Sequence, residues 1–288
     1  MPNALKDKLA GGALVTAMSA HNPLSARLAE EAGFDAIWAS GFELSAAYGV
    51  PDASLLSFSQ HLDMTRAIIE QVGVPLIADL DTGYGNAINV AHVVGAYARA
   101  GAAAVVIEDK TFPKDTSLLA GARQELVRTA EFQGKIEAAR AAGAGHGLLV
   151  IARTEALIAD LGIEEALKRG AAYAEAGADL VLIHSKQRTP DEIVAFTERW
   201  SGVVPLVIVP TAYPDLTEAK VRALGKIALV IYANHAVRAA VSAMREVFAA
   251  IRRDGGIHQV DKRIASVDDI FALQRVAAMK AAEKNFLR

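Results

Sequence analysis

Short apolar runs rich in β-branched residues recur along the chain, and each is followed by a segment with helical periodicity. The runs are LVTAMSA (14–20), DAIWAS (35–40), PLIADLD (75–81), AAVVIED (103–109), LLVIART (148–154), DLVLIHS (179–185), PLVIVPT (205–211) and ALVIYAN (228–234). Nearly continuous apolar runs, in place of alternating ones, are typical of parallel strands covered on both faces. Eight such units in about 250 residues predict an α/β fold, a (β/α)8 TIM barrel. An open doubly wound sheet is the alternative, although no GxGxxG follows the first run.

Glycines and polar residues mark the expected ends of the helices. AGFDA (32–36), AGAAA (100–104) and AGADL (176–180) each place a glycine where a helix would end before the next strand. TPDE (189–192) predicts a helix start in which Thr189 caps, Pro190 takes the first helical position and Glu192 completes a capping box. No low-complexity linker divides the chain, so we expect a single barrel domain over residues 1–288.

One predicted helix has no place in a closed barrel. The helix of the eighth unit is expected at about 236–253, yet SVDDIFALQRVAAMKAAEKNF (266–286) follows it. This extra C-terminal helix carries an apolar stripe of Ile270, Leu273, Val276, Ala277 and Met279. The stripe needs a partner, which is either the flank of the same barrel or, as we expect, a second subunit.

Composition excludes several classes of protein. The formal net charge of −3 and the lack of a basic tract argue against nucleic-acid binding. The absence of cysteine excludes disulfides, thiolate metal sites and a cysteine nucleophile or acid. We find no signal peptide and no apolar run of the roughly 18 to 20 residues that span a bilayer. The sequence therefore predicts a cytoplasmic protein that does not associate with membranes.

Reactive side chains gather at the carboxyl ends of the predicted strands, where TIM barrels carry their active sites. In strand order they are Ser40, Asp79, Asp81, Glu108, Arg153, Glu155, His184, Ser185, Thr211 and Asn234. The amino ends offer mostly alanine, glycine and leucine. This asymmetry predicts a catalytic site at one mouth of the barrel.

Three of these side chains predict a metal site. Asp79 and Asp81 stand two residues apart on one predicted strand, so both should point to the same face, and Glu108 ends the neighbouring strand. Converging carboxylates raise one another's pKa unless a cation neutralises them. An all-oxygen set favours Mg²⁺ or Mn²⁺ over zinc. The alternative is that DTGYG (81–85) is a turn capped by Asp81, which leaves Asp79 and Glu108 unexplained.

Arg153 is a candidate for binding an anion, Glu155 stands two residues after it on the same predicted strand, and His184 ends the next strand. Arginine's planar fork suits a phosphate-like or carboxylate group, and the alternative for Arg153 and Glu155 is a structural ion pair. A lone histidine is usually a packed core residue, but the position of His184 at the barrel mouth favours function. The segment EDKTFPKDTSL (108–118) adds lysines, carboxylates and hydroxyls, and by itself it is equally consistent with a surface loop.

A series of motifs, in order along nearly the whole chain, resembles the phosphoenolpyruvate mutase and isocitrate lyase superfamily. The motifs are WASGFELSAAYGVPD (38–52), ADLDTGYGN (78–86), EDKTFPKDTSL (108–118), ARTEALIA (152–159), IHSK (183–186), VPT (209–211) and YANH (232–235). The lyases of this superfamily carry a KKCGH-type loop with a cysteine acid, which this chain lacks. The mutases carry KTNSL, where this chain has KDTSL with Thr116 at the asparagine position.

The change to Thr116 is typical of the family members that hydrolyse phosphonopyruvate, and RQELV (123–127) and VPTAYP (209–214) extend the likeness. The stretch LLAGARQEL departs from it, because it lacks the DGR triplet expected in this loop. The resemblance implies Mg²⁺-dependent cleavage of the carbon–phosphorus bond to give pyruvate and phosphate, with Mn²⁺ or Co²⁺ able to substitute. The alternatives are a mutase on the same substrate, a Mg²⁺-dependent lyase or decarboxylase on oxaloacetate-like acids, and a non-catalytic barrel.

The resemblance also implies roles for individual residues. Residues 110–123 would form a gating loop over the substrate, and Thr116 would orient water or attack phosphorus itself. The family commonly forms a homotetramer, a dimer of dimers, that exchanges its last helix. The implied metal ligands are Asp79, Asp81 and Glu108; the substrate-binding residues are Trp38, Ser40, Gly41, Phe42, Ser117, Arg153 and His184; and the catalytic residues are Thr116, Lys114, His184, Arg153 and Asp52.

Overall fold

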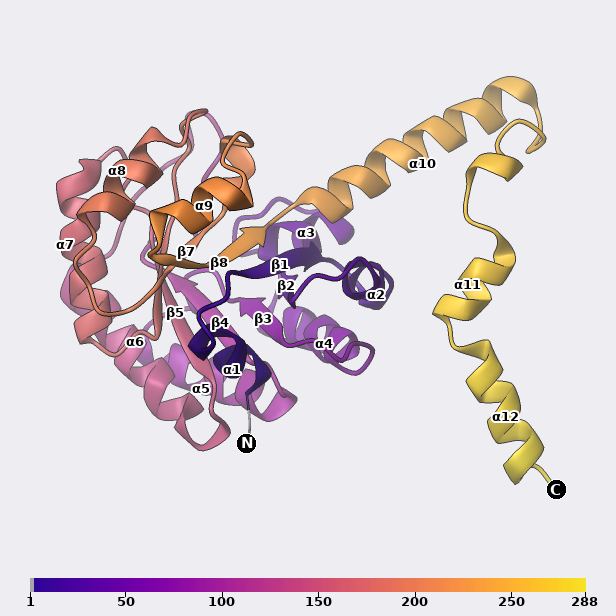
Figure 1. Ribbon diagram of the computed structural model, residues 1–288, viewed down its shortest axis with the longest axis horizontal. Helices are drawn as coiled ribbons and strands as arrows, with labels where there is room; N and C mark the ends of the chain where they lie inside the picture. Colours follow the sequence, from indigo (N-terminus) through magenta and orange to yellow (C-terminus); the bar gives the residue numbers. More distant parts are fainter. Residues whose placement is uncertain (1–2) are drawn as a thin grey trace. The chain divides into compact units, whose positions relative to one another are not determined.

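Eight parallel strands form a closed barrel in the computed structural model, which describes residues 3–288. Each strand pairs with the next, and β8 pairs with β1 (Figure 1). The strands are β1 (Val15–Ala20), β2 (Ala36–Ala39), β3 (Leu76–Asp79), β4 (Ala104–Glu108), β5 (Leu149–Thr154), β6 (Leu180–Ile183), β7 (Leu206–Ile208) and β8 (Ile227–Tyr232). The predicted TIM barrel is confirmed, and the open sheet is excluded.

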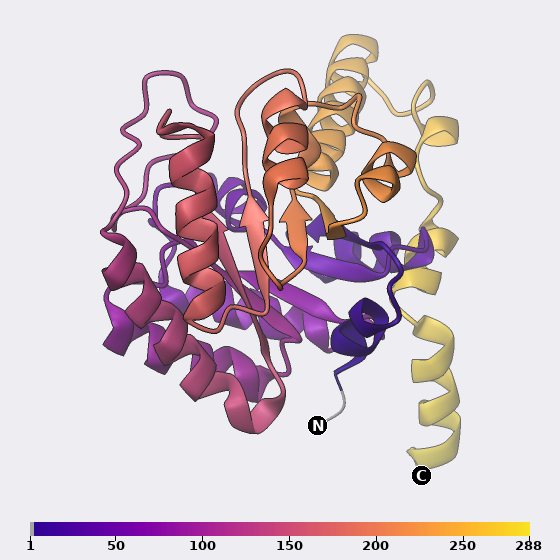
Figure 2. The same ribbon diagram turned by 60° about the vertical axis from the view of Figure 1, so that its left-hand side comes forward.

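Helices cover the outer face of the barrel, as Figures 1 and 2 show for α5, α6 and α7 beside β4 and β5. The helices of residues 3–236 are α1 (Ala4–Ala10), α2 (Pro23–Glu31), α3 (Gly41–Ala47), α4 (Phe58–Ile69), α5 (Ala87–Ala100), α6 (Thr129–Gly143), α7 (Gly162–Glu175), α8 (Asp191–Arg199) and α9 (Glu218–Leu224). Short 3₁₀ turns lie at Ala144–His146 and Pro210–Ala212.

Both faces of each strand are buried, which explains the continuous apolar runs. Along β2, Ala36 and Trp38 pack with residues of the other strands inside the barrel, whereas Ile37 and Ala39 pack against the helices. The same alternation along the other strands gives an inner core and an outer core. A strand buried on both faces has no polar positions left for alternation.

The amino end of the barrel is closed by α1. Leu5 is fully buried against the inner core. The side chain of Asn3, which caps α1, donates to the carbonyl oxygens of Ala103 (2.8 Å) and Gly147 (2.9 Å), just before β4 and β5. The interior of the barrel is therefore covered at its amino end.

The predicted helix ends are partly confirmed. Gly33, Gly101 and Gly177 adopt positive φ angles of 88°, 93° and 99°, as expected of glycines that end helices. The predicted capping box at TPDE is wrong, because α8 begins at Asp191 without a side-chain cap. Glu192 instead accepts a hydrogen bond from Ser185 (2.5 Å).

The remaining residues, 237–288, form a second compact unit. It holds most of α10 (His235–Asp254), a 3₁₀ turn at Asp261–Arg263, α11 (Val267–Leu273) and α12 (Val276–Phe286). The single helix expected over 266–286 is interrupted. The N–H of Arg275 turns back to the carbonyl of Ala272 (3.0 Å), and its φ of 56° lies outside the α-helical range.

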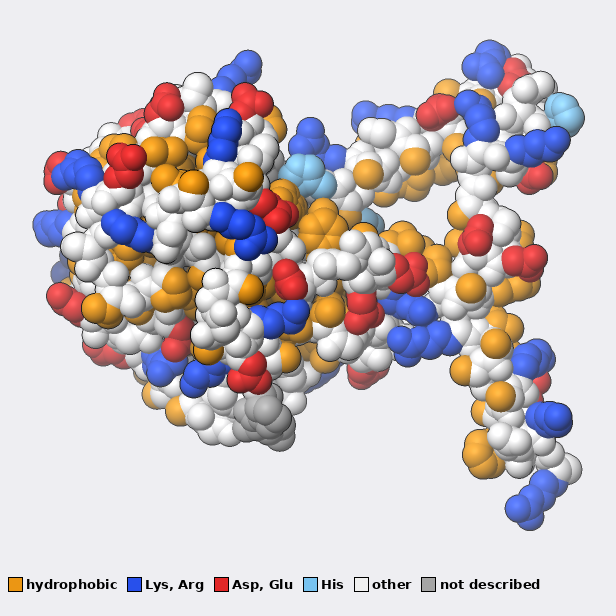
Figure 3. Space-filling model, viewed as in Figure 1, with side chains coloured by type: hydrophobic (Ala, Val, Ile, Leu, Met, Phe, Trp, Pro, Cys, Tyr) orange, Lys and Arg blue, Asp and Glu red, His pale blue; other side chains and the backbone are white. Residues whose placement is uncertain are grey.

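This C-terminal unit buries little of its own surface. Among residues 237–288 only Ala250 and Val260 are buried. Hydrophobic side chains lie at intervals along its surface (Figure 3). Phe248, Phe271 and Met279 are among its exposed hydrophobic residues. Within residues 3–288, no helix combines the length and apolar character needed to cross a membrane.

Candidate active site

A cavity opens at the carboxyl ends of the strands, and most of the predicted site residues line it. They are Trp38, Ser40, Phe42, Asp52, Asp79, Lys114, Thr116, Ser117, Arg153 and His184. Leu118, Val209, Thr211, Ala233 and Asn234 complete the lining. The other predicted residues, Gly41, Asp81 and Glu108, contact members of this lining directly. The structure thus brings the predicted residues together at one place.

The turn from β2 into α3 forms one wall. Ser40 is the N-cap of α3: its hydroxyl accepts from the N–H of Glu43 (3.2 Å) and donates to the carbonyl of Ala233 (3.1 Å). The N–H of Gly41 donates to the Asp79 carboxylate (3.1 Å). The Gly41 amide, which the resemblance assigns to substrate, thus holds an acidic side chain in place.

Asp79 and Asp81 converge, although not by sharing a strand as expected. β3 ends at Asp79, and Asp81 lies beyond it with a left-handed φ of 50°. A Cβ added to Gly41 would lie 2.8 Å from Oδ1 of Asp81 and 3.3 Å from Oδ2 of Asp79. Both carboxylates therefore crowd the same glycine.

The acidic side chains of this wall are buried with too few partners. Burial raises the pKa of Asp79 and of Asp81; for Asp79 the charges of Lys114 and Arg153 oppose that rise, whereas nearby carboxylates reinforce it. Neither side-chain oxygen of Glu108 has a hydrogen-bond partner, although Arg153 Nε lies 3.3 Å from its Oε2. Such a set of buried oxygens fits a hard divalent cation, which supplies the missing positive charge.

Lys114 brings an ammonium group to these carboxylates. Its Nζ pairs with Asp52 Oδ1 (3.0 Å) and with Asp81 Oδ1. Burial lowers the pKa of Lys114, but the charges of Asp81 and Asp52 outweigh it, so the pKa stands well above its usual value. Within residues 3–288, no group of three or more His, Asp or Glu side chains is arranged so that it could hold a metal ion. The ligand set Asp79, Asp81 and Glu108 stays a prediction.

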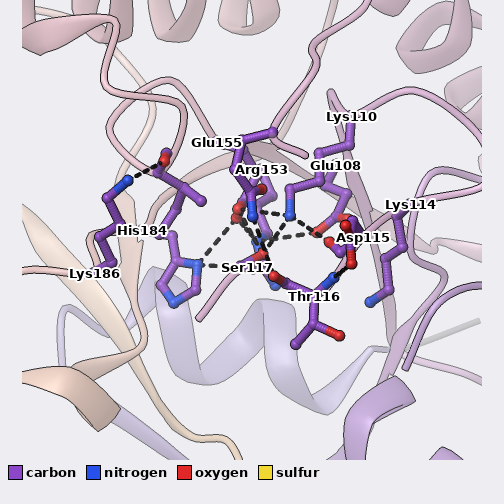
Figure 4. A network of polar contacts seen from close by, with 12 residues as sticks. Glu108, Lys110, Lys114, Asp115, Thr116, Ser117, Arg153, Glu155, His184 and Lys186 are labelled. Atoms are coloured by element: carbon purple, nitrogen blue, oxygen red, sulfur yellow. Dashed lines mark hydrogen bonds and ion pairs between the residues drawn. The ribbon is translucent and has the colours of Figure 1, made fainter. Parts of the chain in front are cut away.

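A second part of the site is a network centred on Glu155, which adjoins the acidic wall where Arg153 lies beside Glu108 (Figure 4). The Glu155 carboxylate accepts from Arg153 Nε and from the Ser117 hydroxyl (2.7 Å), and it lies 3.0 Å from Nδ1 of His184. Arg153 also reaches Ser117 (3.3 Å) and His184 (2.8 Å). Burial raises the pKa of Glu155, but the charge of Arg153 overcomes it and holds the pKa well below the usual range. Burial and Arg153 lower the pKa of His184, which favours the neutral imidazole.

Sequence reasoning placed Glu155 at the barrel mouth and paired it with Arg153, but it assigned no role to the residue beneath it, Asp109. The N–H of Glu155 donates to Asp109 Oδ1 (2.8 Å). The other oxygen of Asp109 accepts from Tyr173 (2.6 Å) and Arg169 (3.2 Å), which come from α7. The sequence did contain a signal for Asp109, because the run EDK at the end of an apolar strand places charged residues where burial is expected.

The loop after β4 reaches over the cavity. The hydroxyl of Thr116 donates to the carbonyl of Asp52 (2.9 Å), and the N–H of Lys114 donates to the hydroxyl of Ser54 (3.2 Å). Two loops from different β-α units therefore meet above the site. Thr116 and Ser117 lie on the cavity lining as predicted.

Known proteins are similar to this chain in fold and in sequence. The model of the phosphoenolpyruvate phosphomutase family matches residues 5–252. The chain is 63% identical to the phosphonopyruvate hydrolase of Variovorax sp. (strain Pal2) over 285 residues, which cover 99% of this chain and 98% of the relative. It is 42% identical to the phosphoenolpyruvate phosphomutase of Tetrahymena pyriformis over 283 residues, 98% of this chain and 94% of the relative.

A crystal structure of phosphonopyruvate hydrolase in complex with oxalate and Mg²⁺ superposes with a TM-score of 0.94. It is 62% identical in sequence and covers 99% of this chain and 98% of the other.

Proposed function

The chain belongs to the phosphoenolpyruvate phosphomutase family, and from this premise we propose that it hydrolyses phosphonopyruvate to pyruvate and phosphate. The observation that carries the proposal is Thr116. This residue lines the cavity together with Arg153 and His184, at the position where the mutase loop pattern has asparagine, and its hydroxyl donates to the carbonyl of Asp52. A hydroxyl can help water to attack phosphorus, a role that an asparagine amide would not provide.

We assign the phosphonyl group of the substrate to the wall around Glu155. Arg153 offers a guanidinium fork, and Ser117 and His184 add further polar contacts at 3.3 and 2.8 Å from it. Because Glu155 already holds these side chains, little reorganisation is needed when the anion binds. Trp38 and Phe42 belong to the apolar part of the lining, and Ser40 lies beside the place where the keto acid would fit.

We assign Mg²⁺ to the acidic wall, through Asp79 and, directly or by way of water, Asp81 and Glu108. When bound there, the ion would polarise the ketone of the substrate. Mn²⁺ and Co²⁺ are expected to substitute. Lys114, which pairs with Asp52 and Asp81, balances the charge of these carboxylates as the substrate enters.

The reaction itself follows from charge. The carbon–phosphorus bond breaks with its electron pair on carbon, and the neighbouring ketone takes up that charge as an enolate. The oxygen of a water molecule bonds to phosphorus, and the proton that the water gives up is balanced by one taken up at the methyl carbon of pyruvate. The Thr116 hydroxyl donates to a main-chain carbonyl, which is not a base able to remove its proton. We therefore assign Thr116 to holding the water rather than to attacking phosphorus.

Phosphorus NMR tests the proposal directly. Protein, Mg²⁺ and phosphonopyruvate are expected to give inorganic phosphate, and added EDTA should abolish the reaction. Phosphoenolpyruvate as the product would support a mutase instead. Full activity in a protein stripped of divalent ions would contradict the metal assignment.

We further propose that residues 110–123 act as the gating loop and that the chain assembles as a homotetramer, a dimer of dimers that exchanges residues 266–286. The support is the apolar surface of the C-terminal unit, since among residues 237–288 only two side chains are buried. A surface of this kind needs a partner.

A further inference from the structure

Lys110 is a buried lysine whose partners lie in the loop above it. Its side chain is 1% exposed, and its Nζ donates to the carbonyl oxygen of Asp115 (2.7 Å) and to the hydroxyl of Ser117 (2.8 Å) (Figure 4). Oε2 of Glu155 lies 3.6 Å away and supplies a negative charge. Lys110 directly follows Asp109 at the end of β4, so the ammonium group belongs to the barrel wall and its acceptors belong to the loop.

The two ends of this loop are tied to each other. The N–H of Thr111 donates to the carbonyl of Glu125 (3.0 Å), and the N–H of Val127 donates to the carbonyl of Asp109 (2.9 Å). Lys110 and Leu126 form an antiparallel bridge between these bonds. Within the proposed gating loop, Lys110 and Thr111 are therefore held at the barrel, so a movement that uncovers the cavity is confined to about residues 112–124. The turn around Thr116 is the part of this segment that must be held.

Asp115 holds that turn from within the loop. One carboxylate oxygen accepts from the N–H of Thr116 (2.9 Å), and the other accepts from the N–H of Arg123 (3.0 Å). The side chain of Gln124 adds a bond to the carbonyl of Thr116 (3.1 Å). The main chain around Thr116 is thus fixed on both sides by groups that point away from the cavity.

We propose that Lys110 and Asp115 form a latch that holds residues 112–124 over the cavity and so places Thr116 and Ser117 for reaction. Neither latch residue is among the cavity lining, so both are positioning residues. A buried ammonium needs acceptors, and lifting the loop would take two away from Lys110 and leave it only Glu155. The closed loop is favoured for that reason. The effect on turnover rests on the proposed function, whereas the effect on the loop does not.

Trypsin cleavage after Arg123 measures the latch without any substrate. The Arg123 side chain is 59% exposed, but cleavage requires the local chain to open. In the Lys110→Met variant we expect cleavage at this bond, identified by mass spectrometry, to be roughly 10- to 100-fold faster, since bonds to a charged group are lost. The variant should fold, because Glu155 keeps Arg153, His184 and Ser117 as partners.

Lys226→Met is the matched control. The Lys226 ammonium likewise donates to two acceptors, the main-chain carbonyls of Glu198 (2.8 Å) and Trp200 (2.7 Å), but it lies just before β8, at the amino end of the barrel. Its loss should leave cleavage at Arg123 unchanged. Asp115→Ala, on the partly exposed loop, should accelerate the same cleavage as Lys110→Met does. Unchanged cleavage at Arg123 in both latch variants would overturn the latch.

Kinetics separate this failure from failure of the proposed function. Both latch variants should lower kcat/KM for phosphonopyruvate roughly 10- to 100-fold, while the Mg²⁺ concentration for half-maximal rate stays unchanged, because the acidic wall is untouched. Asp115→Asn, which keeps one acceptor, should recover part of the loss. A wild-type protein that does not release phosphate would contradict the function and leave the cleavage result standing. Normal kinetics in both variants, with faster cleavage, would overturn the positioning role.

Discussion

Thr116 is the single residue on which the proposed hydrolysis depends. Replacing it with asparagine removes the hydroxyl of this cavity-lining residue and leaves the loop without its bond to the carbonyl of Asp52. We expect Thr116→Asn to lower the rate of phosphate release at least about 100-fold, because positioning the water contributes to every turnover. Thr116→Ser, which keeps the hydroxyl, should retain most activity. Undiminished release by the asparagine variant, followed with a phosphate assay, would remove Thr116 from the mechanism.

Gly41 tests the acidic wall. A methyl group there would come within 2.8 Å of Asp81 and 3.3 Å of Asp79, so the carboxylates must move. We expect Gly41→Ala to raise the Mg²⁺ concentration for half-maximal activity about tenfold, a cost of about 1.4 kcal/mol in metal binding. Gly134→Ala is the control: a Cβ at Gly134, within α6, meets no atom inside 4 Å. An unchanged Mg²⁺ requirement in Gly41→Ala would contradict the placement of the metal.

Residues at strand ends could be predicted from the sequence, whereas residues that act through folded loops could not. Asp79, Glu108, Arg153 and His184 follow apolar runs, and parallel strands bring such ends together. Lys110 reaches Ser117 only because the loop folds back over the barrel, and no spacing in the sequence encodes that return. The reactive residues at strand ends can therefore be predicted from the sequence, but the side chains that they contact cannot.

At the scale of elements, the strands were predicted well and their limits less so. A continuous apolar run identifies a strand buried on both faces, but it extends past the last paired residue. The run 75–81 includes Asp81, which lies beyond β3 in a left-handed conformation. The predicted capping box at 189–192 is wrong for a related reason. The Glu192 carboxylate, which could have capped the helix, accepts a hydrogen bond from Ser185 instead. Tertiary contacts thus decide where a strand ends and which group a side chain bonds, where the local sequence allows more than one outcome.

The packing of α4 on α5 makes the stability depend on pH. His61 of α4 is buried and lies 2.6 Å from the hydroxyl of Tyr97 on α5. Burial, with the charge of Lys114, lowers the pKa of His61 from 6.5 to about 4. Between these values the unfolded chain binds a proton that the folded chain does not, so stability falls as the pH drops from about 6.5 towards 4.

The expected contribution is about 2 kcal/mol lost between pH 7 and pH 5. Urea unfolding at both values, for the wild type and for His61→Asn, measures it. The variant lacks the titrating group, so its stability should fall by about 2 kcal/mol less over this interval. Equal losses in the two proteins would show that His61 is not held neutral by the fold.

At the scale of the whole molecule, repetition made the fold predictable. Eight similar units, each with a strand and a helix, leave few ways to arrange a closed parallel barrel. The C-terminal residues lack that repetition. Their apolar stripe predicted a partner for 266–286, but nothing in the stripe indicated the break at Arg275 or the separate compact unit. An amphipathic pattern indicates that one face of a segment must be buried, but it does not indicate the geometry by which that face is buried.

The proposed tetramer rests on the exposed apolar side chains of the C-terminal unit. Phe271 on α11 and Met279 on α12 are 47% and 50% exposed, and a unit with so few buried side chains has little stability of its own. We expect light scattering to give the mass of a tetramer for the wild type. Phe271→Asp combined with Met279→Asp should shift the mass to smaller species, because two charges would be buried in the interface. Lys284→Glu, an exposed charge on the same helix, should leave the mass unchanged. A wild-type mass equal to one chain would mean that the apolar faces of α11 and α12 find their partner within the same molecule.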